Sequence, residues 1–237
     1  MARSTRTDSG ARALYGCIGL LLCGCATKAP PASSATVQTH FATPRALVEA
    51  LVTACRSGDT AALVAAVGSA NKALVESGNA ATDRAQCQRF VVAADTMTRL
   101  DPAGPDRLVL VVGGYDYPMP VPLVKDAQGW RLDTAAGAAE ITRRAIGMNE
   151  LRAIAVCRTA APGTPASADG YTFRALSGPG ATLVAAPIEY RRTGVMTFLV
   201  GGDGAVYQQD LGADTTRIAS AMMTGAAPDA SWTVVTD

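Results

Sequence analysis

The sequence predicts an α+β protein, in which helices packed on an antiparallel sheet are followed by a long connecting helix and a small four-strand antiparallel β module. Apolar residues recur at helical spacing through most of residues 44–96, whereas alternating apolar runs and Gly/Asp turns dominate after residue 107. Helices and strands that are grouped rather than alternated are typical of the α+β class. A chain of 237 residues is also long enough to bury a sizeable core.

Capping residues mark the first helices. Thr43-Pro44 predicts a helix start, because threonine caps helix N-termini well and proline suits the first helical position. Gly58 is expected to end this helix, and Asp59 is expected to cap a short second one that ends at Gly68. A third helix is expected near residues 82–96, and residues 101–105 (DPAGP) are expected to form a loop.

The β part of this first domain is predicted to begin with a buried strand at residues 107–113. In the next segment, Pro118, Pro120 and Pro122 recur every second residue, which predicts an edge strand whose missing N–H groups all lie on one side. A turn at 126–129 and a strand at 130–133 follow. The order of elements is similar to the NTF2-like cone fold, an analogy that implies little about function.

A long helix is predicted over residues 135–157, with a kink or split at Gly147. Residues 160–170 read as a linker. The remaining residues predict four strands, a hairpin turn at 201–204 and a short last helix at 215–223. The expected organisation is therefore an N-terminal α+β domain (41–134), a connecting helix (135–159), a linker (160–170) and a C-terminal β module (171–237).

The first residues predict an export signal. Three arginines precede the ten-residue apolar run 13–22, which is too short to span a bilayer. The run ends in Leu22-Cys23-Gly24-Cys25, which resembles the bacterial lipobox and implies that Cys25 is acylated after removal of residues 1–24. The alternative is an ordinary cleaved signal. Residues 25–40 are expected to be a flexible tether, and Ala26 favours the outer membrane.

Export also bears on the remaining cysteines. If Cys25 carries the lipid, three thiols are left in an oxidising compartment: Cys55, Cys87 and Cys157. Cys55 and Cys87 lie in two predicted helices of one domain, which favours a disulfide between them. The alternative is that all three are small buried hydrophobic residues. Cys157 is expected to be a core thiol, because no histidine is available to activate it.

Several stretches of the chain resemble a bacterial domain-of-unknown-function family, number 2950. The most specific are the alternating-proline strand with its Gly-Trp turn (LVVGGYDYPMPVPLVKDAQGWRLDTAAG, 110–137) and the run Ile146-Gly147-Met148-Asn149-Glu150-Leu151. The resemblance implies an exported envelope protein without an assigned reaction. One departure concerns the family's long insert after the connecting helix, which here is reduced to about a dozen residues.

Composition and motifs exclude several kinds of site. A formal charge of +1 argues against nucleic-acid binding. The single histidine, His40, falls in the predicted tether and is expected to be solvated, so histidine-activated nucleophiles are not expected. Neither metal-ligand spacings nor phosphate-binding glycine motifs occur in the mature chain, and no cofactor is predicted.

Three functional hypotheses follow. The first is a non-enzymatic, lipid-anchored envelope protein that binds or scaffolds an envelope protein partner of unknown identity, with an interaction surface at Tyr115, Tyr117 and Glu189. An exposed edge strand with aromatic residues could accept a partner strand. The second is an envelope-glycan hydrolase that uses two of the carboxylates Asp116, Asp126, Asp133 and Glu140. The third is a small apolar ligand held inside the N-terminal domain.

Overall fold

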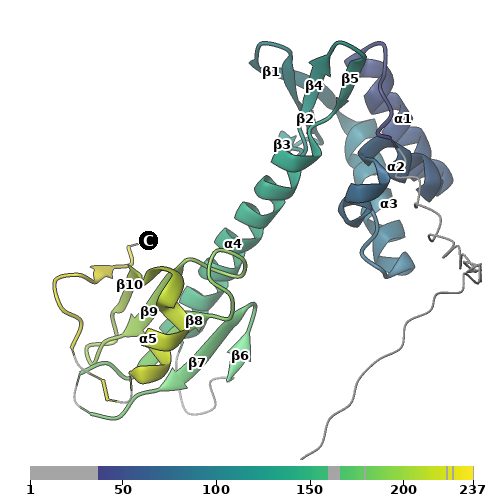
Figure 1. The fold of residues 1–237 in the computed structure, drawn as a ribbon. Coiled ribbons are helices and arrows are strands. Elements are labelled where there is room, and N and C mark those ends of the chain that lie inside the picture. Colours follow the sequence, from purple (N-terminus) through teal and green to yellow (C-terminus); the bar gives the residue numbers. More distant parts are fainter. Residues whose placement is uncertain (1–36, 160–165, 179, 223, 226, 237) are drawn as a thin grey trace, which may run out of the picture. The chain divides into compact units, whose positions relative to one another are not determined.

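A computed structural model describes residues 37–159, 166–178, 180–222, 224–225 and 227–236. The predicted signal and the lipid-acceptor Cys25 lie outside these residues. The fold class is confirmed: helices accompany two antiparallel sheets, and one long helix connects the sheets along the chain (Figure 1). No helix in the described part of the chain is long and apolar enough to cross a membrane.

The first two helices of the N-terminal domain begin and end where their caps predict. Helix α1 spans Pro44–Ser57, with the Thr43 hydroxyl accepting the Ala46 N–H at 3.1 Å and Gly58 ending the helix at φ 71°. Asp59 caps α2 (Thr60–Val67) in the same way. A short 3₁₀ segment, η1 (Ser69–Leu74), and helix α3 (Ala80–Thr96) follow.

Sheet A of this domain contains a strand that was not predicted. Its strands are β1 (Thr98–Gly104), β2 (Arg107–Val112), β3 (Tyr117–Pro118), β4 (Leu123–Asp126) and β5 (Gly129–Leu132), in the order β1-β2-β4-β5 with β3 also paired to β2. The loop expected at 101–105 is therefore wrong for most of its length. Pro102 is tolerated in β1 because β1 is an edge strand, where a missing N–H costs no ladder bond if it faces outward.

The alternating-proline segment is only partly a strand. Pro118 belongs to β3, which pairs with β2 alone, so the predicted edge position is confirmed there. The chain then leaves the ladder around Pro120 and rejoins it at β4. Apolar side chains of α1, β2, β4 and β5 form the core of the domain, with Leu47 and Leu123 completely buried.

Helix α4 (Thr134–Arg158) is a single helix of 25 residues, so the split expected at Gly147 is wrong. Glycine in a helix interior costs about 1 kcal/mol relative to alanine but does not by itself break the hydrogen-bond ladder. Asp133 caps the helix through the Ala136 N–H. The first turn of α4 approaches the segment between β3 and β4 closely, and this approach depends on Gly137, where a Cβ would collide with the side chain of Val121.

Sheet B is a six-stranded meander and includes the four predicted strands. Its strands are β6 (Ser167–Ala168), β7 (Tyr171–Ala175), β8 (Leu183–Pro187), β9 (Met196–Val200), β10 (Val206–Asp210) and β11 (Thr233–Val234), paired in this order. The two strands that the sequence analysis missed, β6 and β11, are the short ones at the edges. The turn η2 (Gly212–Asp214) leads into helix α5 (Thr215–Ala221).

Strand β8 is buried along its whole length because both faces of sheet B are covered. Leu183 and Ala185 pack with the C-terminal half of α4 on one face, whereas Val184 and Ala186 pack with α5 on the other. Figure 1 shows α5 lying against β8. We call sheet B, α5 and this half of α4 the C-terminal module.

Candidate functional site

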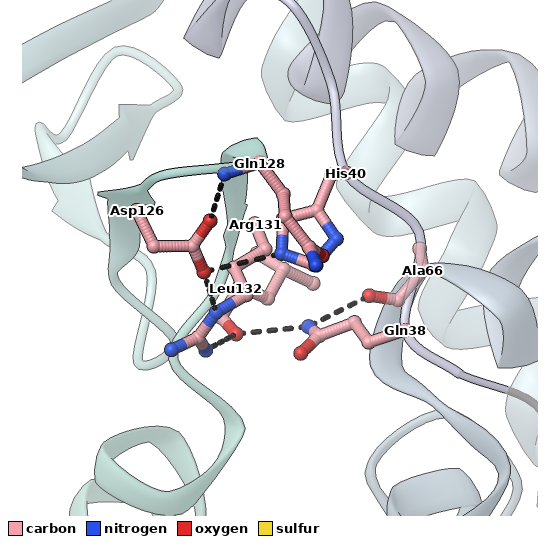
Figure 2. Close-up of polar contacts among 7 residues, drawn as sticks. All are labelled: Gln38, His40, Ala66, Asp126, Gln128, Arg131 and Leu132. Atoms are coloured by element: carbon pink, nitrogen blue, oxygen red, sulfur yellow. Dashed lines mark hydrogen bonds and ion pairs between the residues drawn. The ribbon is translucent and has the colours of Figure 1, made fainter.

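The residues just before α1 form part of the fold. Phe41 and Trp130 exchange two backbone hydrogen bonds, each 2.8 Å long, so the chain runs along the free edge of β5. The amide of Gln38 donates to the carbonyl oxygens of Ala66 at 2.9 Å and Leu132 at 2.8 Å (Figure 2). We call residues 38–41 the N-terminal clasp. The tether predicted for residues 25–40 is thus too long at its C-terminal end.

The clasp is also held by Asp126, which sits at the end of β4. His40 Nε2 and Arg131 Nε lie 3.1 Å and 2.8 Å from Asp126 Oδ2, and the Gln128 N–H donates to Oδ1 at 2.9 Å (Figure 2). Only 18% of the His40 side chain is exposed. The prediction of a solvated His40 is therefore wrong, because the sheet edge places a carboxylate beside it.

These contacts lower the pKa of the Asp126 carboxylate below its usual value. Hydrogen bonds from Arg131, then from the Gln128 N–H and His40, lower the pKa of Asp126 to about 2. A folded-state pKa below the unfolded value means that these contacts stabilise the fold above about pH 4, and that their contribution is lost as the pH falls towards 2. We expect Arg131→Gln to raise the Asp126 pKa more than His40→Gln does, as measured by NMR titration of the carboxyl carbon.

Equal Asp126 pKa values in the two variants would contradict the dominant role of Arg131. Both variants should be titrated at the same ionic strength, because exposed charge pairs are screened by salt.

The predicted aromatic surface lies at the turn between β2 and β3. Tyr115 lies in this turn and its side chain is fully exposed, whereas Tyr117 is half-exposed. Arg144 of α4 donates 2.9 Å hydrogen bonds to the Tyr117 hydroxyl and to the Pro118 carbonyl, and its guanidinium lies 5.3 Å from the centre of the Tyr117 ring. Since proline offers no N–H and this carbonyl is already bonded, the geometry opposes strand addition at Pro118.

The four carboxylates proposed for hydrolysis each bind at least one arginine. Asp116, Asp126, Asp133 and Glu140 pair with, in order, Arg99, Arg131, Arg107, and Arg143 together with Arg144. Arg143 and Arg144 lower the pKa of Glu140. Partial burial opposes ionisation of Asp133, but hydrogen bonds from the Ala136 N–H and Arg107 lower its pKa overall.

A glycosidase acid needs a raised pKa so that it holds a proton near neutral pH. The pKa of Asp126, Asp133 and Glu140 is shifted in the opposite direction. Within the described residues, His, Cys, Asp and Glu side chains also form no group of three or more that could hold a metal ion.

The Asn149-Glu150 pair has a role that sequence reasoning did not assign. Glu150 Oε1 accepts the backbone N–H groups of Val195 at 2.8 Å and Met196 at 3.0 Å, and the Asn149 amide donates to the Thr193 carbonyl at 2.9 Å. These bonds fix the turn that leads into β9. The signal available in the sequence was that this pair belongs to the run 146–151, which resembles the family. Its hydrogen-bond partners lie more than 40 residues further along the chain.

Glu189, the third residue of the predicted interaction surface, belongs to the same turn. Its carboxylate lies 3.3 Å from Arg192 Nε and its side chain is 57% exposed. Its backbone N–H donates to the Thr193 hydroxyl at 3.0 Å. Glu189 therefore contributes to the turn through its backbone N–H and presents its charge to solvent. The structure places Tyr115 in the turn before β3, Tyr117 in β3 of sheet A, and Glu189 in the loop between β8 and β9 of sheet B.

The cysteines are arranged as favoured from the sequence. Cys55 of α1 and Cys87 of α3 form a disulfide across 32 residues of sequence. Cys157 is a free, buried thiol, and burial raises its pKa to about 12. A thiol with such a pKa is almost entirely protonated near neutral pH and is a poor nucleophile.

This arrangement defines an α+β protein with a clasped N-terminal domain and a separate sheet built on a long helix. The chain belongs to the family described as "protein of unknown function (DUF2950)", whose model matches residues 38–165 and 161–235. The match begins at Gln38, so the clasp is part of the family domain. The two matched segments overlap at 161–165, within the linker predicted for residues 160–170. No curated protein and no solved structure matched the chain.

Proposed function

We propose that this protein is a lipid-anchored protein of the bacterial cell envelope that binds or scaffolds another envelope component and catalyses no reaction. The lipobox Leu22-Cys23-Gly24-Cys25 carries the proposal, since acylation of Cys25 would hold the folded part at the periplasmic face of the outer membrane. Two or three acyl chains give stable anchoring, whereas one chain binds reversibly.

The clasp supports the anchoring part of the proposal. In an anchored protein, residues 26–37 would join the lipid to a fixed point on sheet A, because Gln38 and Phe41 are bonded to the domain. The exposed Tyr115 and Tyr117 rings and the charged Glu189 turn are the surfaces we propose for partner binding. The depressed pKa values of Asp126, Asp133 and Glu140 favour binding over carboxylate hydrolysis.

Intact-mass analysis of the membrane fraction tests the anchor. We expect the wild-type mass to equal residues 25–237 plus two or three acyl chains, and Cys25→Ala to abolish this species because it removes the acceptor thiol. Cys23→Ser is the matched control: it changes the neighbouring cysteine but keeps a small residue before Cys25, and should leave acylation intact. An unacylated wild-type mass, or an acylated Cys25→Ala protein, would refute the lipid anchor.

A further inference from the structure

Sheet A ends in β5 on one side, where Phe41 of the N-terminal clasp pairs with Trp130, and in β1 on the other side. The outer edge of β1 pairs with no further described strand. Strand β1 pairs with β2 alone, in the register Thr98↔Val112 and Leu100↔Leu110. The Gly113 N–H donates to the Met97 carbonyl at 3.0 Å. Because hydrogen-bonded pairs alternate along an antiparallel ladder, the N–H and C=O groups of Thr98 and Leu100 point away from β2. None of the hydrogen bonds between described residues uses these groups.

A groove lies beside this edge, lined by β1, helix α1 and the C-terminal end of α3, and has a volume of about 470 Å³. Val48, Val52, Ala94 and Leu100 supply its apolar lining. Its charged side chains are already paired with one another and are exposed, in the two ion pairs Arg45–Glu49 and Arg56–Asp95. The groove therefore offers an apolar floor with rim charges of both signs.

The dimensions suit an extended segment. The lining residues of α1 run from Arg45 to Arg56, which at 1.5 Å per residue is about 16 Å of helix. A β-strand of about five residues has the same length. Pro102, the next outward-facing residue of β1, has no N–H to offer and would end the pairing there.

We infer that the edge of β1 and the groove beside α1 together bind an extended peptide segment of a partner protein, which adds to sheet A as a further strand. Thr98 and Leu100 would each donate one backbone hydrogen bond to the segment and accept one from it. Every second side chain of the segment would face the groove, so the recognised pattern is apolar residues at alternate positions. The inference rests on the binding part of the proposed function and names its partner class.

A peptide fits the edge better than a second copy of the chain does. A second β1 would bring to the groove the side chains that alternate on the face of Leu100, namely Thr98, Leu100 and Pro102. Only one of these is a large apolar residue. A small apolar ligand would fill the floor but leave the open N–H and C=O groups of Thr98 and Leu100 without partners.

The test uses random nonapeptides displayed on phage and selected on the purified full-length chain. Each selected peptide is then resynthesised in three versions: unmethylated, N-methylated at its odd-numbered residues, and N-methylated at its even-numbered residues. The two methylated versions are the two registers. N-methylation removes backbone donors but keeps the side chains. Thr53→Trp fills the groove from an exposed position on α1, and Thr142→Trp makes the same change at an exposed position on α4.

We expect alternating apolar peptides whose affinity falls at least about tenfold in one methylated register and in Thr53→Trp, but not in Thr142→Trp. Binding should also slow hydrogen exchange of the Thr98 and Leu100 amides. The inference is overturned if selection yields no binder, if both registers and Thr53→Trp bind normally, or if protection appears elsewhere. Concentration-dependent protection of these amides in the free protein would instead identify a second copy as the occupant.

The peptide-binding inference and the proposed function can be refuted independently of each other. If the groove binds no peptide while a crosslinked envelope partner maps to Tyr115, Tyr117 or Glu189, then the binding function stands and the inference about β1 is wrong. If Cys25 is not acylated but peptides bind at β1, the proposed lipid anchor is wrong, whereas the inference that the β1 edge and the groove bind a peptide is supported.

Discussion

Replacing Cys55 and Cys87 together with serine is expected to lower the free energy of unfolding of the N-terminal domain by about 3–4 kcal/mol. The disulfide joins α1 to α3 across 32 residues, and a closed loop of that length restricts the unfolded chain by roughly this amount on the loop-entropy model. Trp130 packs against the core of this domain. Its fluorescence in a Trp232→Phe background therefore reports urea unfolding of the domain.

Reduction of the wild-type protein should reproduce the effect of the double serine variant. The same reductant added to the double variant is the control and should change nothing, because Cys157 is buried and unpaired. A Trp130 transition that is insensitive to both reduction and substitution would show that the disulfide does not stabilise this domain.

Glu150→Ala is expected to lower the free energy of unfolding of the C-terminal module by about 2 kcal/mol. The substitution leaves the partly buried N–H groups of Val195 and Met196 without their carboxylate acceptor. Losing an acceptor costs more than the net contribution of a hydrogen bond, because the donor stays desolvated. Trp232 packs against the α5 side of sheet B, so its fluorescence in a Trp130→Phe background reports this unfolding.

Two further variants separate the acceptor role from charge. Glu150→Gln keeps a carbonyl oxygen in place and should lose less than half as much stability as Glu150→Ala. Glu189→Ala removes an exposed carboxylate from the same turn and should change stability by less than about 1 kcal/mol. If Glu189→Ala costs as much as Glu150→Ala, the Glu150 carboxylate is not what holds the turn.

Local signals explain which parts of the fold could be predicted. The ends of α1 followed from Thr43, Pro44 and Gly58, because caps act within a few residues of the helix end. The four main strands of the C-terminal module followed from alternating apolar residues between turn signals. The Cys55–Cys87 pairing followed from the few thiols available and their place in neighbouring helices.

Non-local pairing explains the misses. Strand β1 contains Pro102 and Gly104, which read locally as a loop, and its register with β2 outweighs that local preference. His40 lies 86 residues from Asp126 along the chain, and Glu150 lies 45 residues from Val195. No spacing in the sequence connects such pairs.

The sequence by itself therefore determined the α+β class, the first helix boundaries and the family, and it favoured the disulfide partners, since each rests on short-range patterns or on a small set of candidates. Only the tertiary structure decided which edge of sheet A is open. Arg144 and the prolines close the edge at Pro118, whereas the side of β1 that faces away from β2 pairs with no further described strand and lies beside a groove. The physical reason is that an edge is defined by the strand missing next to it, which depends on how distant segments pack.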